Sequence, residues 1–385
     1  MKQRIIQLLK LFIFDLLSGS LLLSSFNSCV VESTQNSAAW DAMDYPAPAD
    51  SVNLVKMDES VFGKPIPLKG EYVIIDPIIM PAEMEAFIKD GFFFLKHLEK
   101  SNGEPSLHVM ELPSMNVVIE LAKRGDGPAE VLDTRLIQTT DSDKYCFIHD
   151  VSKDLLYYID KEFKFHPFHR NIVPKNVPGS KIGSEGAIHL GNEKFLFTQW
   201  ADVGTGIIQM DFLDMMAHGV INLVCSDDLD RKWPADWSCF LGKACSTLKG
   251  RRLAYAYNYY HRILFSDFDG KNIKVVQFKE QDSFNSNDMW DHMNTGKDVF
   301  YYQTAFGSSN YAYFVYKGSS FADKRELPVY LEQWTWDGKP VKRFELEKGM
   351  YPLGGCVDEK TSTLYLLDVT KDDFIYKVQM GNDKI

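Results

Sequence analysis

The sequence has no excess of positive charge and no cluster of basic residues. Its 385 residues include 42 lysines and arginines against 53 aspartates and glutamates, a formal net charge of −11. Binding to a nucleic-acid backbone needs clustered Lys and Arg side chains. We therefore expect no nucleic-acid partner for this protein.

Long apolar runs are also missing. No uninterrupted apolar run is longer than about ten residues, whereas a helix that spans a membrane needs roughly 20. A quarter of the residues are charged and 45% are hydrophobic. This balance excludes a multi-span membrane protein and a disordered chain, and it predicts a folded domain.

Several motifs that carry chemistry are absent. The sequence contains no C-x-x-C pair, no G-x-S-x-G elbow, no H-E-x-x-H and no Walker-type loop. These absences argue against a zinc site, a thioredoxin-type centre, a serine hydrolase and a phosphate-binding loop. No cofactor is implied, and a non-catalytic role is favoured.

The first 28 residues have the order of a secretory signal. Three basic residues within the first ten positions are followed by two apolar runs, and Ser28 precedes Cys29. We predict a lipoprotein signal peptide over residues 1–28, with Cys29 lipidated after cleavage. The mature chain, with a net charge of −13, would then sit in the bacterial cell envelope, on the periplasmic or the surface side, and touch the membrane through this anchor only.

The remaining chain divides into two parts. Residues 29–68 are rich in Ser, Ala, Pro and Asp and show no periodicity, which predicts an extended tether. Residues 69–385 show the alternating pattern of β-strands almost throughout, which predicts an all-β domain.

Five cysteines remain once Cys29 is set aside. Cys146 and Cys356 lie in apolar runs, which predicts buried thiols. Cys225, Cys239 and Cys245 lie in a stretch of loop-like composition, where one disulfide fits an oxidising compartment. The sequence does not determine which two of these three cysteines would pair.

A repeated unit organises the all-β domain. An apolar, aromatic run followed by a polar pair and a turn recurs at intervals of roughly 50 residues, the length of a four-stranded propeller blade. The runs are Phe92–His97, Tyr145–Asp150, Phe195–Trp200, Leu253–Asn258, Val299–Thr304 and Leu364–Asp368. We therefore predict a six-bladed β-propeller, and two β-sandwich domains are the less economical alternative.

Ring closure follows from the strand count. Only three strands fit after Met350, so the last blade lacks its outermost strand. Residues 71–76 precede the first repeat and have no partner of their own. We predict that they complete the last blade, which would leave no open edge at the seam.

Three motifs resemble those of one family. Residues 124–130 (RGDGPAE) resemble a G-x-G-P-x-E turn, residues 334–341 (WTWDGKPV) a W-D-G-x-P-V hairpin, and Val357-Asp358-Glu359 with Tyr365-Leu366-Leu367 a closing-blade signature. The chain thus resembles the TolB-like six-bladed propeller lipoproteins of Bacteroides-type bacteria over residues 65–380. The resemblance implies the fold rather than a ligand, because these motifs are turn chemistry.

A candidate binding site follows from the repeat. Propellers usually bind ligands at one end of the central channel, where the turns after the second strands converge. The alignment of the repeats puts six polar or aromatic side chains there, and the alternative is that they cap turns. They are His97, Asp150, Trp200, Asn258, Gln303 and Asp368.

Two functions remain open at this point. The first is a non-catalytic binding or scaffolding protein for a glycan, a peptide or an envelope protein. The alternative is a propeller enzyme, such as a metal-dependent lactonase or a lyase, with its site at the channel mouth. A divalent ion held by several of the six side chains would favour the enzyme.

Overall fold

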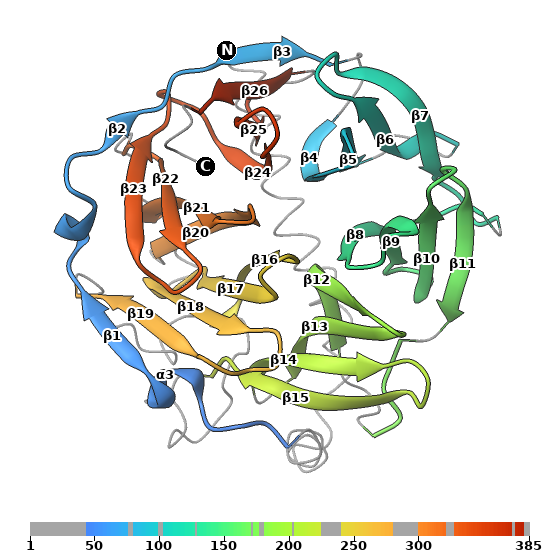
Figure 1. The fold of residues 1–385 in the computed structure, drawn as a ribbon, viewed down its shortest axis with the longest axis horizontal. Coiled ribbons are helices and arrows are strands. Elements are labelled where there is room, and N and C mark those ends of the chain that lie inside the picture. The colour runs from blue at the N-terminus through green and yellow to red at the C-terminus, as the bar shows by residue number, and fades with distance from the viewer. Residues whose placement is uncertain are drawn as a thin grey trace.

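The computed structural model describes residues 44–75, 80–98, 103–127, 129–170, 172–176, 181–201, 204–224, 240–279, 299–320, 327–371 and 374–380. Almost all of the regular structure is β, and the strands form a ring around a central axis (Figure 1). None of the helices within these ranges is long and apolar enough to cross a membrane.

The ring is built from antiparallel units of four strands. The units are β4 (Met80–Lys89), β5 (Phe92–Leu98), β6 (Pro105–Glu111) and β7 (Asn116–Lys123); β8 (Thr134–Thr139), β9 (Lys144–Asp150), β10 (Leu155–Asp160) and β11 (Phe165–Arg170); β12 (Lys181–Gly191), β13 (Lys194–Ala201), β14 (Gly204–Asp211) and β15 (Met216–Asn222); β16 (Gly242–Thr247), β17 (Arg252–Tyr257), β18 (Arg262–Asp267) and β19 (Lys274–Phe278); β20 (Val299–Gly307), β21 (Tyr311–Ser320), β22 (Tyr330–Thr335) and β23 (Pro340–Glu345); and β24 (Pro352–Asp358), β25 (Thr363–Asp368) and β26 (Phe374–Gln379) with β3 (Glu71–Ile74). The innermost strands of two neighbouring units, β8 and β12, pair in parallel and join them into one sheet of eight strands.

The predicted closure by an N-terminal strand is confirmed. β3 pairs antiparallel with β26, with Ile74 opposite Phe374 and Glu71 opposite Lys377. An early and a late strand of the chain thus share one sheet, and Figure 1 shows β3 at the outer rim beside β26. The pairing gives hydrogen-bond partners to the backbone groups along the outer edge of β26, as the strand count required.

The predicted tether differs from the structure. Residues 44–68, here called the belt, run along the outer rim and are fastened to it (Figure 1). The belt consists of α3 (Ala49–Val52), β1 (Leu54–Met57), the 3₁₀ turn η2 (Glu59–Phe62) and β2 (Ile66–Pro67). β1 pairs in parallel with β19, and β2 pairs in parallel with β23. Such short strands carry almost no periodic signal, so the sequence pattern could not reveal them.

The belt begins against the β12–β15 unit. The hydroxyl of Tyr45 donates to Oε1 of Gln199 at 2.6 Å, and Pro48 forms an isolated parallel β-bridge with Asn222. Gly206 makes room for this contact, because a Cβ at that position would lie 2.2 Å from the Tyr45 ring. Farther along, Asp50 accepts from Nη1 of Arg262 at 3.1 Å, with both side chains almost fully buried.

Apolar clusters lie between neighbouring units. Phe147 of one unit packs edge-on against Phe195 of the next, with ring centroids 5.1 Å apart. Phe93 of the first unit likewise contacts Tyr365 of the last unit, with ring centroids 5.4 Å apart. Each sheet therefore buries both of its faces, which explains why its strands are apolar and aromatic on both sides.

Two of the three family-like motifs are turns, as the resemblance implied, whereas the third lies mostly in strands β24 and β25. In the first, the Glu130 carboxylate accepts from the amide of Gly127 at 2.8 Å, and Nζ of Lys153 donates to the carbonyls of Gly125 and Glu130. In the second, Gly338 has φ +70° at the tip of the β22–β23 hairpin. That left-handed conformation suits glycine, since a side chain would strain it.

The cysteine predictions have mixed outcomes. Cys146 and Cys356 are buried free thiols, as predicted. Cys245 lies in strand β16 as a buried free thiol rather than in a loop, so it takes no part in a disulfide. Cys225 and Cys239 lie outside the described residues. Burial raises the pKa of the Cys146 thiol to about 12, which keeps it protonated and unreactive.

Candidate functional site

Asp150 and Asp368 occupy equivalent places and cap turns. Each ends the second strand of its unit and is fully buried. Asp150 accepts from the amide of Leu132 at 2.9 Å, and Asp368 accepts from the amide of Tyr351 at 3.0 Å. Both donors lie just before the innermost strand of the same unit. The repeat therefore uses these carboxylates to tie the second strand to the start of the first.

His97 belongs to a chain of side chains across one sheet. Its Nε2 lies 2.8 Å from Nδ1 of His108, and Nε2 of His108 lies 3.3 Å from Oε1 of Glu120. A carboxylate can only accept, so a proton on Nε2 of His108 makes its Nδ1 an acceptor for His97. The buried ring of His97 is thus oriented by two neighbouring strands, β6 and β7.

Gln303 lies in a different strand from the one predicted. It is in β20, the innermost strand of its unit, whereas the other five residues lie in or directly after second strands. Its run was assigned to a second strand because it is as apolar and aromatic as the others. Both polar atoms of its buried amide have no hydrogen-bond partner within the described residues.

Asn258 lies close to the strand that carries Gln303. It directly follows β17, and its carbonyl accepts from the amide of Tyr301 in β20 at 2.7 Å. Its side-chain Oδ1 is buried without a partner in the part of the chain that the structure describes. Trp200 lies in β13 opposite Thr205, and its side chain is outside the described part.

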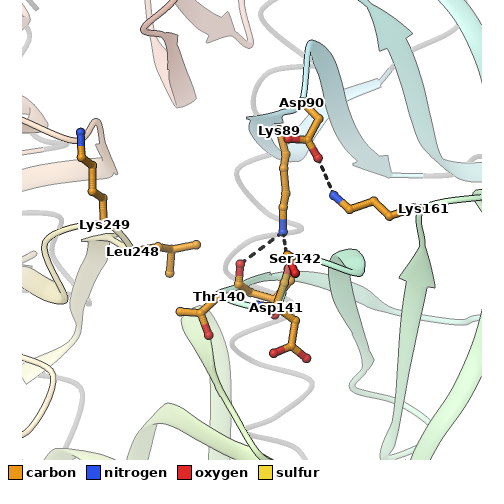
Figure 2. A pocket seen from close by; sticks show the side chains of 9 residues that line it. Lys89, Asp90, Thr140, Asp141, Ser142, Lys161, Leu248 and Lys249 are labelled. Atoms are coloured by element: carbon orange, nitrogen blue, oxygen red, sulfur yellow. Dashed lines mark hydrogen bonds and ion pairs between the residues drawn. The ribbon is translucent and has the colours of Figure 1, made fainter.

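A cavity lies at the opposite ends of the strands. It has a volume of about 390 Å³ and is lined by turns from three units (Figure 2). In the first unit, Lys89 lies opposite Phe92 at the cavity end of the β4–β5 strand pair. Leu98, the neighbour of His97, lies at the far end of the same pair. The lining residues are Lys89, Asp90, Thr139, Thr140, Asp141, Ser142, Lys161, Leu248 and Lys249.

Lys89 organises one wall of the cavity. Its Nζ donates to the carbonyls of Lys144 at 2.7 Å, Asp141 at 3.0 Å and Thr139 at 3.3 Å, and so holds the β8–β9 turn in place. Figure 2 shows its side chain reaching down to that turn, with Leu248 on the other side of the space. Burial, together with the charge of Lys161, lowers the pKa of Lys89.

A buried histidine lies behind the same turn. Nδ1 of His189 is 2.7 Å from Oγ1 of Thr139 and 3.8 Å from Oδ2 of Asp141. Burial lowers the pKa of His189 to about 4 even though Asp141 opposes the shift, so the imidazole is neutral at neutral pH. The Asp141 carboxylate instead pairs with Lys144 at 3.0 Å.

The cavity walls are mixed in charge and rich in hydroxyl groups. Lys161 pairs with Asp90 on one side, and Lys249 is exposed on the β16–β17 turn. Thr140 and Ser142 add hydroxyls. Such a lining can exchange hydrogen bonds with a polar ligand. No group of three or more His, Cys, Asp or Glu side chains in the described ranges is arranged to hold a metal ion.

Sequence reasoning missed the cavity because it considered only the turns after second strands. The turns after first strands carry Lys89-Asp90, Thr140-Asp141-Ser142 and Lys249 in three different units. The same alignment of repeats, applied to these turns, would have found the polar residues. It would not have found the space between them, which depends on how the units are placed around the axis.

Two comparisons by sequence found no match. No protein-family model matches the chain, and no curated protein matches it in sequence.

Among solved structures, a member of the DUF4221 family from Bacteroides vulgatus aligns with a TM-score of 0.55 and 10% identity, over 81% of this chain and 94% of that one. A Bacteroides fragilis protein provisionally described as exported aligns at 0.48 and 12% identity, over 76% and 79% of the two chains. A streptogramin B lyase aligns at 0.44 and 10% identity, over 80% and 97%. The likeness to the DUF4221 protein, together with the ring of sheets, supports a β-propeller fold for this chain.

Proposed function

We propose that this protein is a non-catalytic binding protein, a six-bladed propeller of the TolB-like kind that takes a polar ligand at the end of its channel. The six four-stranded units in the described residues support this blade count. The cavity of about 390 Å³ carries the functional part of the proposal.

The cavity walls suit a ligand of the glycan or peptide type. Hydroxyl, ammonium and carboxylate groups come from three units, so a bound molecule would meet donors and acceptors on several sides. Lys89 is already engaged by three carbonyls and acts as a support. Lys249 and Ser142 are the side chains proposed to contact the ligand.

Asn258, at the strand ends away from the cavity, and Gln303, midway along β20, are also proposed as ligand contacts. A buried amide without a partner is costly, and a ligand hydroxyl or peptide group would satisfy it. Asp150 and Asp368 have less to offer, since their oxygens already accept from backbone amides.

A thermal-shift screen tests the binding proposal. Wild type and Lys249→Ala/Ser142→Ala would be titrated with glycans, short peptides and divalent metal ions. A ligand at 100 times its Kd stabilises a protein by about 2.7 kcal/mol, so we expect a glycan or a peptide to raise the Tm of wild type and to raise that of the double variant much less.

The matched control is Lys339→Ala, which changes an exposed lysine on the β22–β23 turn, a turn that contributes no cavity residue. It should respond as wild type does. A Tm that rises with divalent metal ions but with no glycan or peptide would contradict the binding role and favour a metal-dependent lactonase or lyase.

The envelope location is a separate proposal that rests on the leader. We propose that Cys29 carries a lipid and that residues 30–43 link it to the belt. In a bacterial host, wild type should fractionate with membranes, and Cys29→Ala should move to the soluble fraction because it lacks the acceptor thiol. Cys146→Ala, which alters a buried thiol of the propeller, is the control. Membrane retention of Cys29→Ala would overturn the anchor.

A further inference from the structure

The cavity gathers lysines in a chain that is acidic as a whole. The formal net charge of the chain is −11, yet three of the five charged residues that line the cavity are lysines. Lys89, Lys161 and Lys249 come from three different units, and Figure 2 shows the first two across the space from the third. Cations that converge on one hollow from separate units create a local positive potential, which attracts anions.

Both aspartates of the lining are already paired with lysines. Asp90 pairs with Lys161, and Asp141 pairs at 3.0 Å with Lys144, which lies outside the lining. Within the described residues, neither carboxylate is hydrogen-bonded to Lys89 or Lys249. The two aspartates therefore leave part of the positive charge of the cavity uncompensated.

Lys89 and Lys249 carry this uncompensated charge. Nζ of Lys89 donates to three backbone carbonyls of the β8–β9 turn, which use its three protons without cancelling its charge. Lys249 is exposed and makes no ion pair in the part of the chain that the structure describes. Burial, and after it the charge of Lys161, lowers the pKa of Lys89, so these two cations repel each other. An anion in the cavity would relieve that repulsion.

We propose that the cavity binds a sugar that carries a carboxylate, a uronic acid, and that Lys249 is the direct partner of that carboxylate. The inference rests on the binding function proposed for this cavity and names the class of its ligand. The ammonium of Lys249 sits on a flexible stem and can turn its donors toward a carboxylate. Lys89 attracts the same group by its charge alone, since its donors are occupied.

The rest of the lining favours a sugar over a peptide. Thr140 and Ser142 present hydroxyl groups, which can both donate and accept, as the hydroxyls of a sugar do. Leu248 adds a small apolar surface for the C–H groups of a sugar ring. Extended peptides are usually bound along an open strand edge, whereas this cavity is lined by turns.

Paired acidic and neutral sugars test the ligand class on the full chain. The probes are trimers of galacturonate, glucuronate and mannuronate, each compared with its methyl ester, which keeps the ring hydroxyls and removes the charge. By titration calorimetry, we expect at least one acidic trimer to bind about tenfold more tightly than its ester, because a hydrogen bond to a charged group is the stronger one. Raising NaCl from about 0.05 M to 0.5 M should weaken the acid and leave the ester unchanged.

Variants of Lys249 test its assigned contact. Lys249→Ala should lower the affinity for the acidic trimer about tenfold and hardly change that for the ester. Lys249→Arg keeps a cation at the same place and should retain most of the affinity. Lys339→Ala, on a turn that contributes no cavity residue, is the matched control and should bind as wild type does. Lys249 is exposed, so we expect each variant to fold, and the Tm without ligand checks this.

The outcomes separate this inference from the binding function on which it rests. Acids and esters that bind equally well, with an affinity that Lys249→Ala/Ser142→Ala lowers, would refute the acidic ligand and leave the binding function standing. A tripeptide of glutamates that binds when no uronate trimer does would likewise refute the sugar. If no glycan and no peptide binds at all, the binding function fails as well.

Discussion

Arg343→Ala is expected to lower the free energy of unfolding by about 3–5 kcal/mol. The guanidinium is the charged partner of Glu332, a carboxylate that no water reaches in the folded chain. Removing it leaves this buried charge uncompensated and also frees Glu59 of the belt. Urea denaturation, followed by tryptophan fluorescence because Trp334 contacts Glu332, would measure the loss.

Two further variants test whether the loss comes from the buried ion pair or from the removal of any charged side chain. Lys339→Ala removes an exposed lysine from the same β22–β23 hairpin. Losing its pair with Asp337 should change the stability little, because water and salt screen an exposed ion pair. Arg343→Met with Glu332→Leu removes both charges at similar volume and should recover most of the loss. If Arg343→Ala alone costs no more than Lys339→Ala, the assignment of a buried ion pair is wrong.

Acid is expected to destabilise the folded domain. His149 and His189 are both almost fully buried, and burial lowers the pKa of each to about 4. The unfolded chain takes up protons at these residues near pH 6.5, whereas the folded chain does not. Stability is therefore fully present above about pH 6.5 and falls toward pH 4, by about 3 kcal/mol for each histidine.

Denaturation midpoints between pH 7.5 and 4.5 would show this loss as a steady decrease. His149→Phe removes one of the two protons, so its midpoint should depend less steeply on pH than that of wild type. His166→Asn is the control, since His166 lies partly exposed beside Asp160. A wild-type midpoint that stays constant down to pH 5 would contradict the prediction.

The candidate site shows what an alignment of the repeats can and cannot predict. Alignment of the repeats placed Asp150 and Asp368 at equivalent positions, and their identical capping role confirms that they are equivalent. The same alignment misplaced Gln303, because β20 is as apolar and aromatic as the second strands of the other units. Pattern alone cannot separate an innermost strand from its neighbour when both faces of a sheet are buried.

The sequence by itself determined the all-β class, the unit length, the turn chemistry and the closing strand. Each depends on residues close together in the chain or on a simple count of strands. Only the tertiary structure decided that the belt is fastened to the rim and that a cavity opens at the turns after first strands. The physical reason is distance along the chain: Glu59 meets Arg343, and Lys89 faces Leu248 across the cavity, so no local pattern records either contact.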